Sequence, residues 1–299
     1  MSEKKLLFVF NPKSGMGLIK NNLLDIVDVM VKAGYEPTVY PTQARGDATR
    51  KVREDGAQYE RIVCSGGDGT LDEVVTGMRE ADLQMPLGYI PAGSTNDFAR
   101  TLGIPNHMVK AAEIAVGDHV FPCDVGQFND DTFIYIVGFG LFTEISYDTP
   151  QELKNVLGHA AYILSAAKSL ATIPNYLMQV EANGEVIEDR FIYGMVTNSI
   201  SVAGFTGITG KDVELDDGEF EVTLIKSPSN PLELTEIIEY LTGIISETKM
   251  VYKFKSSHII VRSRSSVSWT MDGENGGEHW SVEIKNHHKK LNILTKEVE

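Results

Sequence analysis

The feature that most constrains the fold of this chain is a pattern that occurs three times in its first third. Each time, a short apolar run leads into a loop rich in Gly, Ser or Thr, and a helical pattern follows. The run–loop pairs are Leu6–Phe10 with Asn11–Gly17, Arg61–Ser65 with Gly66–Thr70, and Leu87–Ile90 with Pro91–Asp97. Such units are typical of a mainly parallel sheet with helices on both faces. Because ligands bind beyond the carboxyl ends of the strands in these sheets, we expect the three loops to form one site.

Beyond about Asp124 the pattern changes to short segments separated by turns. The strand candidates are Thr132–Val137, Tyr176–Glu181, Val186–Tyr193, Phe220–Ile225, His258–Val261, Val267–Met271 and Leu291–Leu294. Asn183-Gly184 lies between two of them and is typical of a tight hairpin turn. Helical patterns interrupt the strands at Gln151–Ala171 and Pro231–Ile245. These segments predict a mainly antiparallel β domain.

The sequence therefore predicts two domains. The first, residues 1–125, is an α/β domain with a parallel sheet and helices on both of its faces. The second, residues 126–290, is mainly antiparallel β. The last strand and the rest of segment 291–299 are a candidate addition to the first domain. A length of 299 residues fits two domains, because domains usually have about 150 residues.

Composition limits the classes of partner and compartment. The chain has 27 Lys and Arg residues against 42 Asp and Glu residues, a formal net charge of −15. We expect no nucleic-acid partner, because polyanion binding needs a basic surface, whereas a small anion held by backbone amides is compatible with this charge. Cys64 and Cys123 are isolated, which indicates a reducing compartment and no metal-binding pattern. With no signal-peptide core and no run of about 20 apolar residues, we expect a cytoplasmic protein.

The loop Ser65–Thr70 has the composition of a phosphate-binding turn. Its three glycines let the backbone approach a ligand and donate N–H groups, and the helix that follows adds the positive end of its dipole. The carboxylate of Asp68 fits poorly beside bare phosphate but well where Mg²⁺ or water bridges the two. The same residues also suit a plain turn in which Asp68 caps the helix, and position alone leaves both interpretations open.

Five short motifs together resemble the catalytic domain of diacylglycerol kinases, most closely the soluble bacterial ones. They are Asn11-Pro12-Lys13-Ser14-Gly15, Gly66-Gly67-Asp68-Gly69-Thr70, Pro91-Ala92-Gly93-Ser94-Thr95-Asn96-Asp97-Phe98-Ala99, Leu215-Asp216-Asp217-Gly218 and Asp272-Gly273-Glu274. The second motif is also similar to one in sphingosine kinases and NAD kinases, and the third separates the lipid kinases from the NAD kinases. The resemblance runs in order from about residue 6 to residue 276.

The resemblance implies an NAD kinase-like first domain that binds ATP. The implied ATP-binding residues are Asn11, Pro12, Lys13, Ser14, Gly15, Thr42, Gly66, Gly67, Asp68, Gly69, Thr70, Leu71, Asp72 and Ser94. Ser94 stands where the family usually has Thr, and its hydroxyl keeps the ability to bond phosphate. By themselves, Asn11-Pro12 also suits an ordinary turn, and Ser94 suits a helix cap.

The acidic segment at 214–219 carries an implied metal site. On the residues alone it is a solvated acidic turn before a strand. The resemblance implies a structural Mg²⁺, held by the carboxylate of Asp217 and the backbone carbonyls of Glu214 and Glu219, with waters completing the octahedron. Asp216 is the alternative carboxylate.

The motif Asp272-Gly273-Glu274 carries the implied proton acceptor. A carboxylate at the end of a strand can take the hydroxyl proton that leaves as phosphate is transferred to an alcohol. The resemblance favours Glu274. Asp272 is the alternative base, or holds a water–Mg²⁺ network with Asp68 and Asp124. The Asp-Gly pair is equally typical of a plain hairpin turn.

The resemblance implies an enzyme that uses ATP to phosphorylate diacylglycerol to phosphatidic acid, with the lipid headgroup entering between the domains. It also implies peripheral, reversible association with a membrane surface, and a homodimer. A helical pattern at Val156–Ile173 is a candidate for docking at the membrane, although core packing also explains its apolar residues.

Three other functions stay open. One is a kinase of a different lipid alcohol, such as a sphingoid base or phosphatidylglycerol. Another is an NAD kinase, against which the Asn96-Asp97 element counts. The last is a non-catalytic nucleotide sensor, which would not need the carboxylates Asp68, Asp272 and Glu274.

Overall fold

The computed structural model describes residues 4–15, 17–93, 96–141, 173–199, 201–202, 205–206 and 213–296. The chain divides into two compact units. The first unit comprises residues 1–125 and 287–299, and the second comprises residues 126–286. Ser94 and the predicted helices at Gln151–Ala171 and Val156–Ile173 fall largely or wholly outside the described residues.

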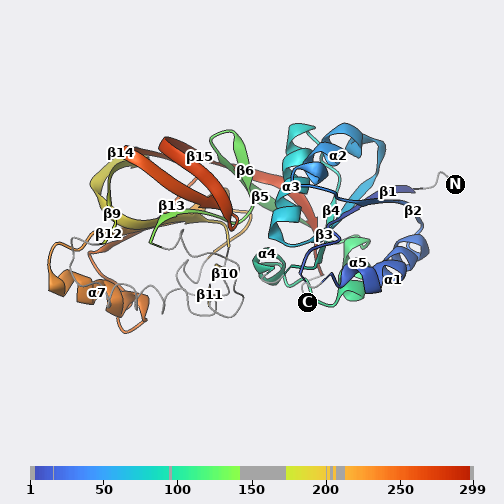
Figure 1. Ribbon diagram of the computed structural model, residues 1–299, viewed down its shortest axis with the longest axis horizontal. Helices are drawn as coiled ribbons and strands as arrows, with labels where there is room; N and C mark the ends of the chain where they lie inside the picture. The colour runs from blue at the N-terminus through green and yellow to red at the C-terminus, as the bar shows by residue number, and fades with distance from the viewer. Residues whose placement is uncertain are drawn as a thin grey trace. The chain divides into compact units, whose positions relative to one another are not determined.

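The first unit begins with alternating strands and helices (Figure 1). Its strands are β1 (Lys4–Phe10), β2 (Tyr35–Pro41), β3 (Arg61–Gly66), β4 (Leu87–Pro91), most of β5 (Val120–Phe128) and the end of β15 (Glu274–Leu294). Its helices are α1 (Ile19–Lys32), α2 (Asp47–Asp55), the 3-10 turn Gly56–Gln58, α3 (Asp68–Glu80), α4 (Asp97–Thr101) and α5 (Met108–Ala115).

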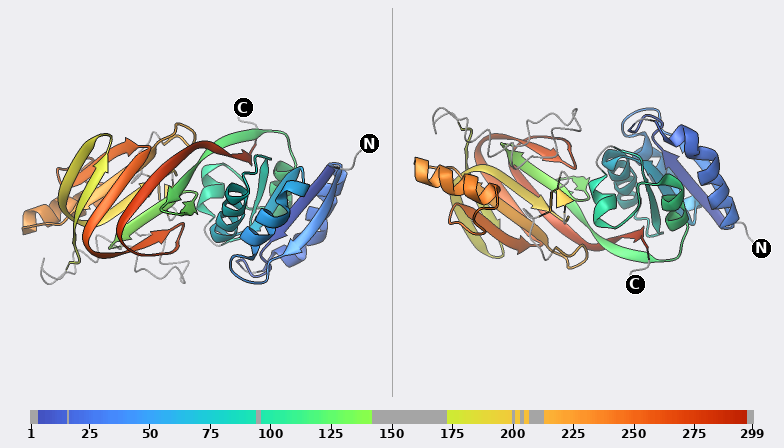
Figure 2. Two further views of the ribbon diagram at one scale, coloured as in Figure 1. Left: turned by 90° about the horizontal axis from the view of Figure 1, so that it is seen from above. Right: turned by 90° about the horizontal axis from the view of Figure 1, so that it is seen from below.

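Strands β1 to β4 pair in parallel, in the order β4-β3-β1-β2. Helices α1 and α5 pack together, as do α2 and α3, and the sheet lies between these two pairs (Figures 1 and 2). All residues of β3 and β4, and Leu6–Phe10 of β1, are buried. Continuous burial is expected for strands that are covered on both faces.

The end of β15 completes the first unit. Ile293 pairs in parallel with Leu87 of β4, and the N–H of Lys289 donates to the buried carboxylate of Asp124 at 2.7 Å. These contacts explain why residues 287–290, expected in the second domain, belong to the first unit.

The second unit is rich in antiparallel strands, which confirms the β domain predicted from the sequence. Its described strands are β6 (Asp131–Phe133), β7 (Ile136–Gly140), β8 (Tyr176–Ala182), β9 (Glu185–Thr197), β10 (Ser201–Val202), β11 (Phe205–Thr206), β12 (Phe220–Lys226), β13 (Val251–Ser256), β14 (His258–Met271) and the first part of β15. Its described helix is α7 (Pro231–Leu241).

Two long strands of the second unit change partner along their length. The first half of β9 pairs with β8, and its second half pairs with β7 and β12. The first half of β14 likewise pairs with β8, and its end pairs with β7. A core of aromatic and aliphatic side chains packs among these strands, including Phe139 and Trp269, whose ring centroids are 4.9 Å apart.

Several strands and one helix begin or end at residues other than those predicted from the sequence. The expected strand Thr132–Val137 is interrupted between β6 and β7, because the N–H groups there bond a side chain instead of a neighbouring strand. The two strands expected within 258–271 are one strand, β14, with an irregular register between Arg262 and Val267. The helix expected to reach Ile245 ends at Leu241, and the left-handed Gly243 follows. The expected Asn183-Gly184 hairpin is confirmed, with φ of 55° and 77°.

Candidate functional site

The three glycine-containing loops of the first unit lie against one another, as expected from the sequence. The N–H of Asn11, after β1, donates to the carbonyl of Ser65 at the end of β3 at 2.9 Å. The N–H of Gly67 donates to the hydroxyl of Ser14 at 3.3 Å. The N–H of Ala92, after β4, donates to the carbonyl of Gly66 at 2.8 Å. The described parts of these loops therefore form one continuous surface of backbone at the carboxyl edge of the sheet.

Glycine is required where these loops cross. A Cβ at Gly93 would lie 2.6 Å from the Cα of Gly67, so the two backbones touch without a side chain between them. A Cβ at Gly15, whose φ is 54°, would collide with the carbonyl oxygen of Ala92. Glycine at these positions therefore lets the backbones of the three loops approach one another closely.

Replacing Gly15 by alanine should therefore damage the loops beyond the usual cost of a left-handed alanine. Gly103 is a matched control, because its φ is 66° and nothing lies within 4 Å of the Cβ it would gain. Gly103→Ala should lose about 1–2 kcal/mol of unfolding free energy from backbone strain alone. Gly15→Ala should lose more, because its Cβ would also collide with the carbonyl oxygen of Ala92.

The measurement is denaturant unfolding of both variants. Equal losses of stability in both would mean that the contact between Gly15 and Ala92 is unimportant.

Asp68 is the first residue of α3 and is 9% exposed. Gly67 holds the N-cap position, and no side chain caps the helix there, which argues against the interpretation of Asp68 as an N-cap. Below the loop, the hydroxyl of Tyr89 donates to the carbonyl of Gly66 at 3.2 Å. Burial, and next the negative charge of Asp68, raise the pKa of Tyr89 well above its ordinary value, so its hydroxyl stays a donor.

The third loop is shaped by Asn96, which is not one of the implied ATP-binding residues. Its side-chain oxygen accepts from the N–H of Gly93 and its side-chain nitrogen donates to the carbonyl of Gly93, both at 2.9 Å. Its φ of 51° is in the left-handed region, which Asn tolerates better than most residues. Its spacing, three residues after a glycine at a strand end, was the available signal.

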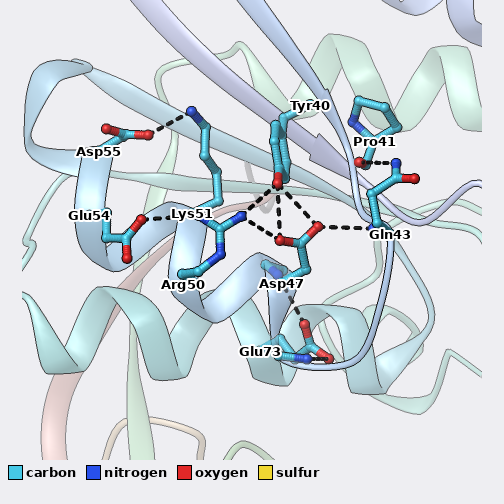
Figure 3. Close-up of polar contacts among 11 residues, drawn as sticks. Tyr40, Pro41, Gln43, Asp47, Arg50, Lys51, Glu54, Asp55 and Glu73 are labelled. Carbon is cyan, nitrogen blue, oxygen red and sulfur yellow. Dashed lines mark hydrogen bonds and ion pairs between the residues drawn. The ribbon is translucent and has the colours of Figure 1, made fainter.

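Thr42 lies at the same edge of the sheet, because it directly follows β2. Its N–H donates to the carbonyl of Phe10 at 2.9 Å, next to the loop that begins at Asn11. The loop that Thr42 starts is fixed by a network of polar contacts around Asp47 and Glu73 (Figure 3). Sequence reasoning did not find Glu73, which is next to the implied ATP-binding residue Asp72.

The carboxylate of Asp47 is the centre of one half of this network. It accepts from the N–H of Gln43 at 2.9 Å, from the hydroxyl of Tyr40 and from the guanidinium of Arg50. Burial alone would raise the pKa of Asp47, but these hydrogen bonds outweigh it and the pKa is lowered. Asp47 is therefore a stable anion that holds the loop to β2 and α2.

In the second unit, Asp272 and Glu274 occupy very different surroundings. Asp272 and Gly273 form the turn between β14 and β15, with φ of 48° and 82°. The carboxylate of Asp272 is buried and accepts three consecutive N–H groups, from Ile134 at 2.6 Å, Tyr135 at 3.1 Å and Ile136 at 2.9 Å. Glu274 is exposed as the first residue of β15. The geometry makes Asp272 an anchor of the turn, whereas Glu274 is exposed.

The acidic turn of the second unit pairs with a lysine. Asp217 accepts from the N–H of Glu219 at 2.9 Å and from the ammonium of Lys255 at 2.7 Å. The same ammonium lies 3.3 Å from a carboxylate oxygen of Glu221, which is 6% exposed. Burial raises the pKa of Glu221 to about 7.

Among the described residues, no group of three or more His, Cys, Asp and Glu side chains is placed to hold a metal. The implied Mg²⁺ site needs only one carboxylate, with the carbonyls of Glu214 and Glu219, and these hard oxygen donors are the kind Mg²⁺ prefers. In this structure the ammonium of Lys255 lies 2.7 Å from one carboxylate oxygen of Asp217, so a cation bound there would have to displace the lysine or share the carboxylate with it.

Two further features bear on the expectations from sequence. Asp124, an alternative member of the water–Mg²⁺ network, uses its carboxylate to bond the backbone of Lys289. In the part of the chain that the structure describes, no helix has the length and apolar character needed to cross a membrane.

Comparisons with known proteins agree with the order of the motifs. Residues 5–128 match the family described as diacylglycerol kinase catalytic domain, and residues 137–294 match the family described as YegS C-terminal NAD kinase beta sandwich-like domain. Diacylglycerol kinase of Bacillus subtilis (strain 168) is 34% identical over 281 residues, 92% of this chain and 91% of that protein. The enzyme of the same name from Staphylococcus carnosus (strain TM300) is also 34% identical over 281 residues, 92% of this chain and 90% of that protein.

Solved structures share the fold. A diacylglycerol kinase from Bacillus anthracis (strain Sterne) has a TM-score of 0.76 and 25% identity, over 99% of this chain and 98% of that chain. A second structure from the same organism has a TM-score of 0.84 at 24% identity, over the same shares of the two chains.

Proposed function

Since this chain belongs to the diacylglycerol kinase family of lipid kinases, we propose that it transfers the γ-phosphoryl group of ATP to the free hydroxyl of diacylglycerol, giving phosphatidic acid and ADP. The observation that carries the proposal is the meeting of the three glycine-containing loops in the first unit. The N-terminus of α3, which the Gly66–Thr70 loop opens, favours a polyphosphate over an uncharged ligand.

The proposed reaction divides the work between the two units. In the first, the proposed ATP-binding residues are those at 11–15 and 66–72 with Thr42 and Ser94, and Asp68 would hold the divalent cation that accompanies ATP. In the second, Glu274 accepts the proton of the lipid hydroxyl as its oxygen forms a bond to the γ-phosphorus, while the bond from that phosphorus to the bridging oxygen of ADP breaks. A divalent cation, when bound, neutralises part of the phosphate charge.

The identity of the acceptor is tested by offering several candidate acceptors in parallel reactions. Purified full-length protein would be incubated with γ-labelled ATP and Mg²⁺, together with diacylglycerol, sphingosine or phosphatidylglycerol in mixed micelles, or with NAD in solution. We expect label in phosphatidic acid. Label only in another phospholipid or in a sphingoid base would identify that lipid as the substrate instead of diacylglycerol. Label only in NAD would overturn the assignment as a lipid kinase. Binding of ATP without transfer to any acceptor would favour a nucleotide sensor.

We also propose that the turn at 214–219 holds a structural Mg²⁺ through the carboxylate of Asp217 and the carbonyls of Glu214 and Glu219. Mg²⁺ should then raise the melting temperature, because a ligand that binds only the folded state stabilises it by mass action. Asp217→Asn should lose most of this Mg²⁺-dependent shift, and Asp216→Asn should keep it. The measurement is thermal unfolding over a series of Mg²⁺ concentrations. The reverse result would make Asp216 the carboxylate ligand. Equal Mg²⁺-dependent shifts in both variants would exclude a Mg²⁺ site that depends on either carboxylate.

A further inference from the structure

The loop that begins at Thr42 has little apolar contact to hold it in place. It runs from Thr42 to Gly46, between β2 and α2, and four of its five residues are exposed. An exposed loop with no buried side chains keeps one conformation only where polar contacts fix it. The N–H of Thr42 bonds the amino-terminal end of the loop to β1, and a separate set of contacts is needed to fix the other end.

Glu73 of α3 fixes that end. Its two carboxylate oxygens accept from the N–H of Gly46 at 2.8 Å and from the N–H of Ala48 at 3.1 Å (Figure 3). Its own backbone carbonyl accepts from the hydroxyl of Thr49 at 2.9 Å. Gly46 is the N-cap residue of α2 and no side chain of α2 caps the helix there, so the carboxylate of Glu73 takes the place of a cap.

The contact joins two segments that belong to the proposed nucleotide site. Glu73 follows directly on Asp72 in the helix that Asp68 begins, and Thr42 lies four residues before Gly46. Glu73 therefore links α3 to the far end of the loop that Thr42 starts, and the Gly46 N–H that it binds is 27 residues away in sequence.

We propose that Glu73 is a positioning residue for the nucleotide, which acts by holding the loop of Thr42 against α3 without touching the substrate. The inference rests on the proposed function, because it takes Thr42 as a ligand of ATP. It predicts that loss of the Glu73 contact lowers the affinity for ATP more than it lowers the rate of phosphoryl transfer, since the reacting groups are elsewhere.

Glu73→Gln tests the contact with little change of shape. A carboxamide keeps one acceptor oxygen, but its NH₂ group faces a backbone N–H that needs an acceptor. We expect the KM for ATP to rise about tenfold, as loss of about 1.4 kcal/mol of positioning would give. The kcat and the KM for diacylglycerol should stay within about twofold, a split that a general loss of folding would not produce.

The chain supplies a matched control on the same two helices. Glu80 of α3 pairs with Arg53 of α2 at 3.0 Å, and both side chains are well exposed, so the pair joins the helices without contacting the loop. Glu80→Gln should leave every kinetic constant unchanged, because exposed ion pairs contribute little to stability. A rise in the KM for ATP of the same size in Glu80→Gln would mean that the packing of α2 on α3, and not the loop, is responsible.

A double-mutant cycle shows whether Glu73 acts through Thr42. Thr42→Val, Glu73→Gln and the double variant would be compared by equilibrium binding of Mg·ATP. If the effect passes through Thr42, Glu73→Gln should cost almost nothing further in the Thr42→Val background, whereas independent effects would add. Additive effects, or unchanged ATP binding in Glu73→Gln, would overturn this inference. Absence of ATP binding by the unmodified protein would instead overturn the proposed function.

Discussion

Glu274→Gln is expected to lower the rate of phosphatidic acid formation by about 100- to 10,000-fold, the range that a general base usually contributes. The substitution keeps the shape of the side chain and removes its ability to take a proton. Glu274 is exposed at the start of β15, so the free energy of unfolding should change by no more than about 0.5 kcal/mol.

The control for this variant lies on the same strand. Glu278 is also exposed in β15 and accepts a hydrogen bond from the hydroxyl of Ser266 at 3.2 Å. Glu278→Gln should keep full turnover. Initial rates with saturating ATP and diacylglycerol, together with denaturant unfolding, measure both properties. A Glu274→Gln enzyme with more than about a tenth of normal turnover would exclude Glu274 as the base.

Asp272→Ala should act on folding instead. It removes the acceptor of three backbone N–H groups and places alanine at a φ of 48°, where the left-handed conformation is unfavourable. Each buried donor left without a partner costs about 1–3 kcal/mol, so we expect a loss of about 3 kcal/mol or more in unfolding free energy. Denaturant unfolding of purified variants measures this loss.

Asp272→Asn separates this anchoring role from catalysis. Asparagine tolerates the left-handed region and keeps one acceptor oxygen, so it should lose less stability than alanine and retain turnover within about tenfold. If Asp272 were the base, Asp272→Asn would stay folded and lose turnover as severely as Glu274→Gln. If Asp272→Ala does not fold, Asp272→Asn still shows whether Asp272 is an anchor or the base.

The sequence predicted the loops of the first unit well because their determinants are local. A buried strand, a glycine-containing turn and a helix follow one another directly in the chain, and the carboxyl ends of parallel strands meet at one edge. The convergence of those loops was confirmed by the bonds from Asn11 to Ser65, Gly67 to Ser14 and Ala92 to Gly66. Their binding of ATP is a proposal that these contacts support.

Roles that depend on distant partners could not be read from the sequence. The carboxylate of Asp272 meets N–H groups that lie 136 to 138 residues earlier in the chain, so the sequence could not distinguish an anchor from a base. Those same bonds interrupt the strand that was expected across 132–137. Glu73 likewise binds the backbone of a segment 25 to 27 residues away, and looks by itself like any acidic residue on a helix.

The shared strand β15 has a consequence for how the protein is made. Leu87 at the edge of the first unit's sheet pairs with Ile293, which follows the whole of the second unit in the chain. Until residue 293 has been synthesised, that edge has an open row of backbone groups, which in nascent chains invites association with other strands. A fragment cut at Val125 would keep this open edge permanently, so a fragment made to contain the first unit needs β15 as well.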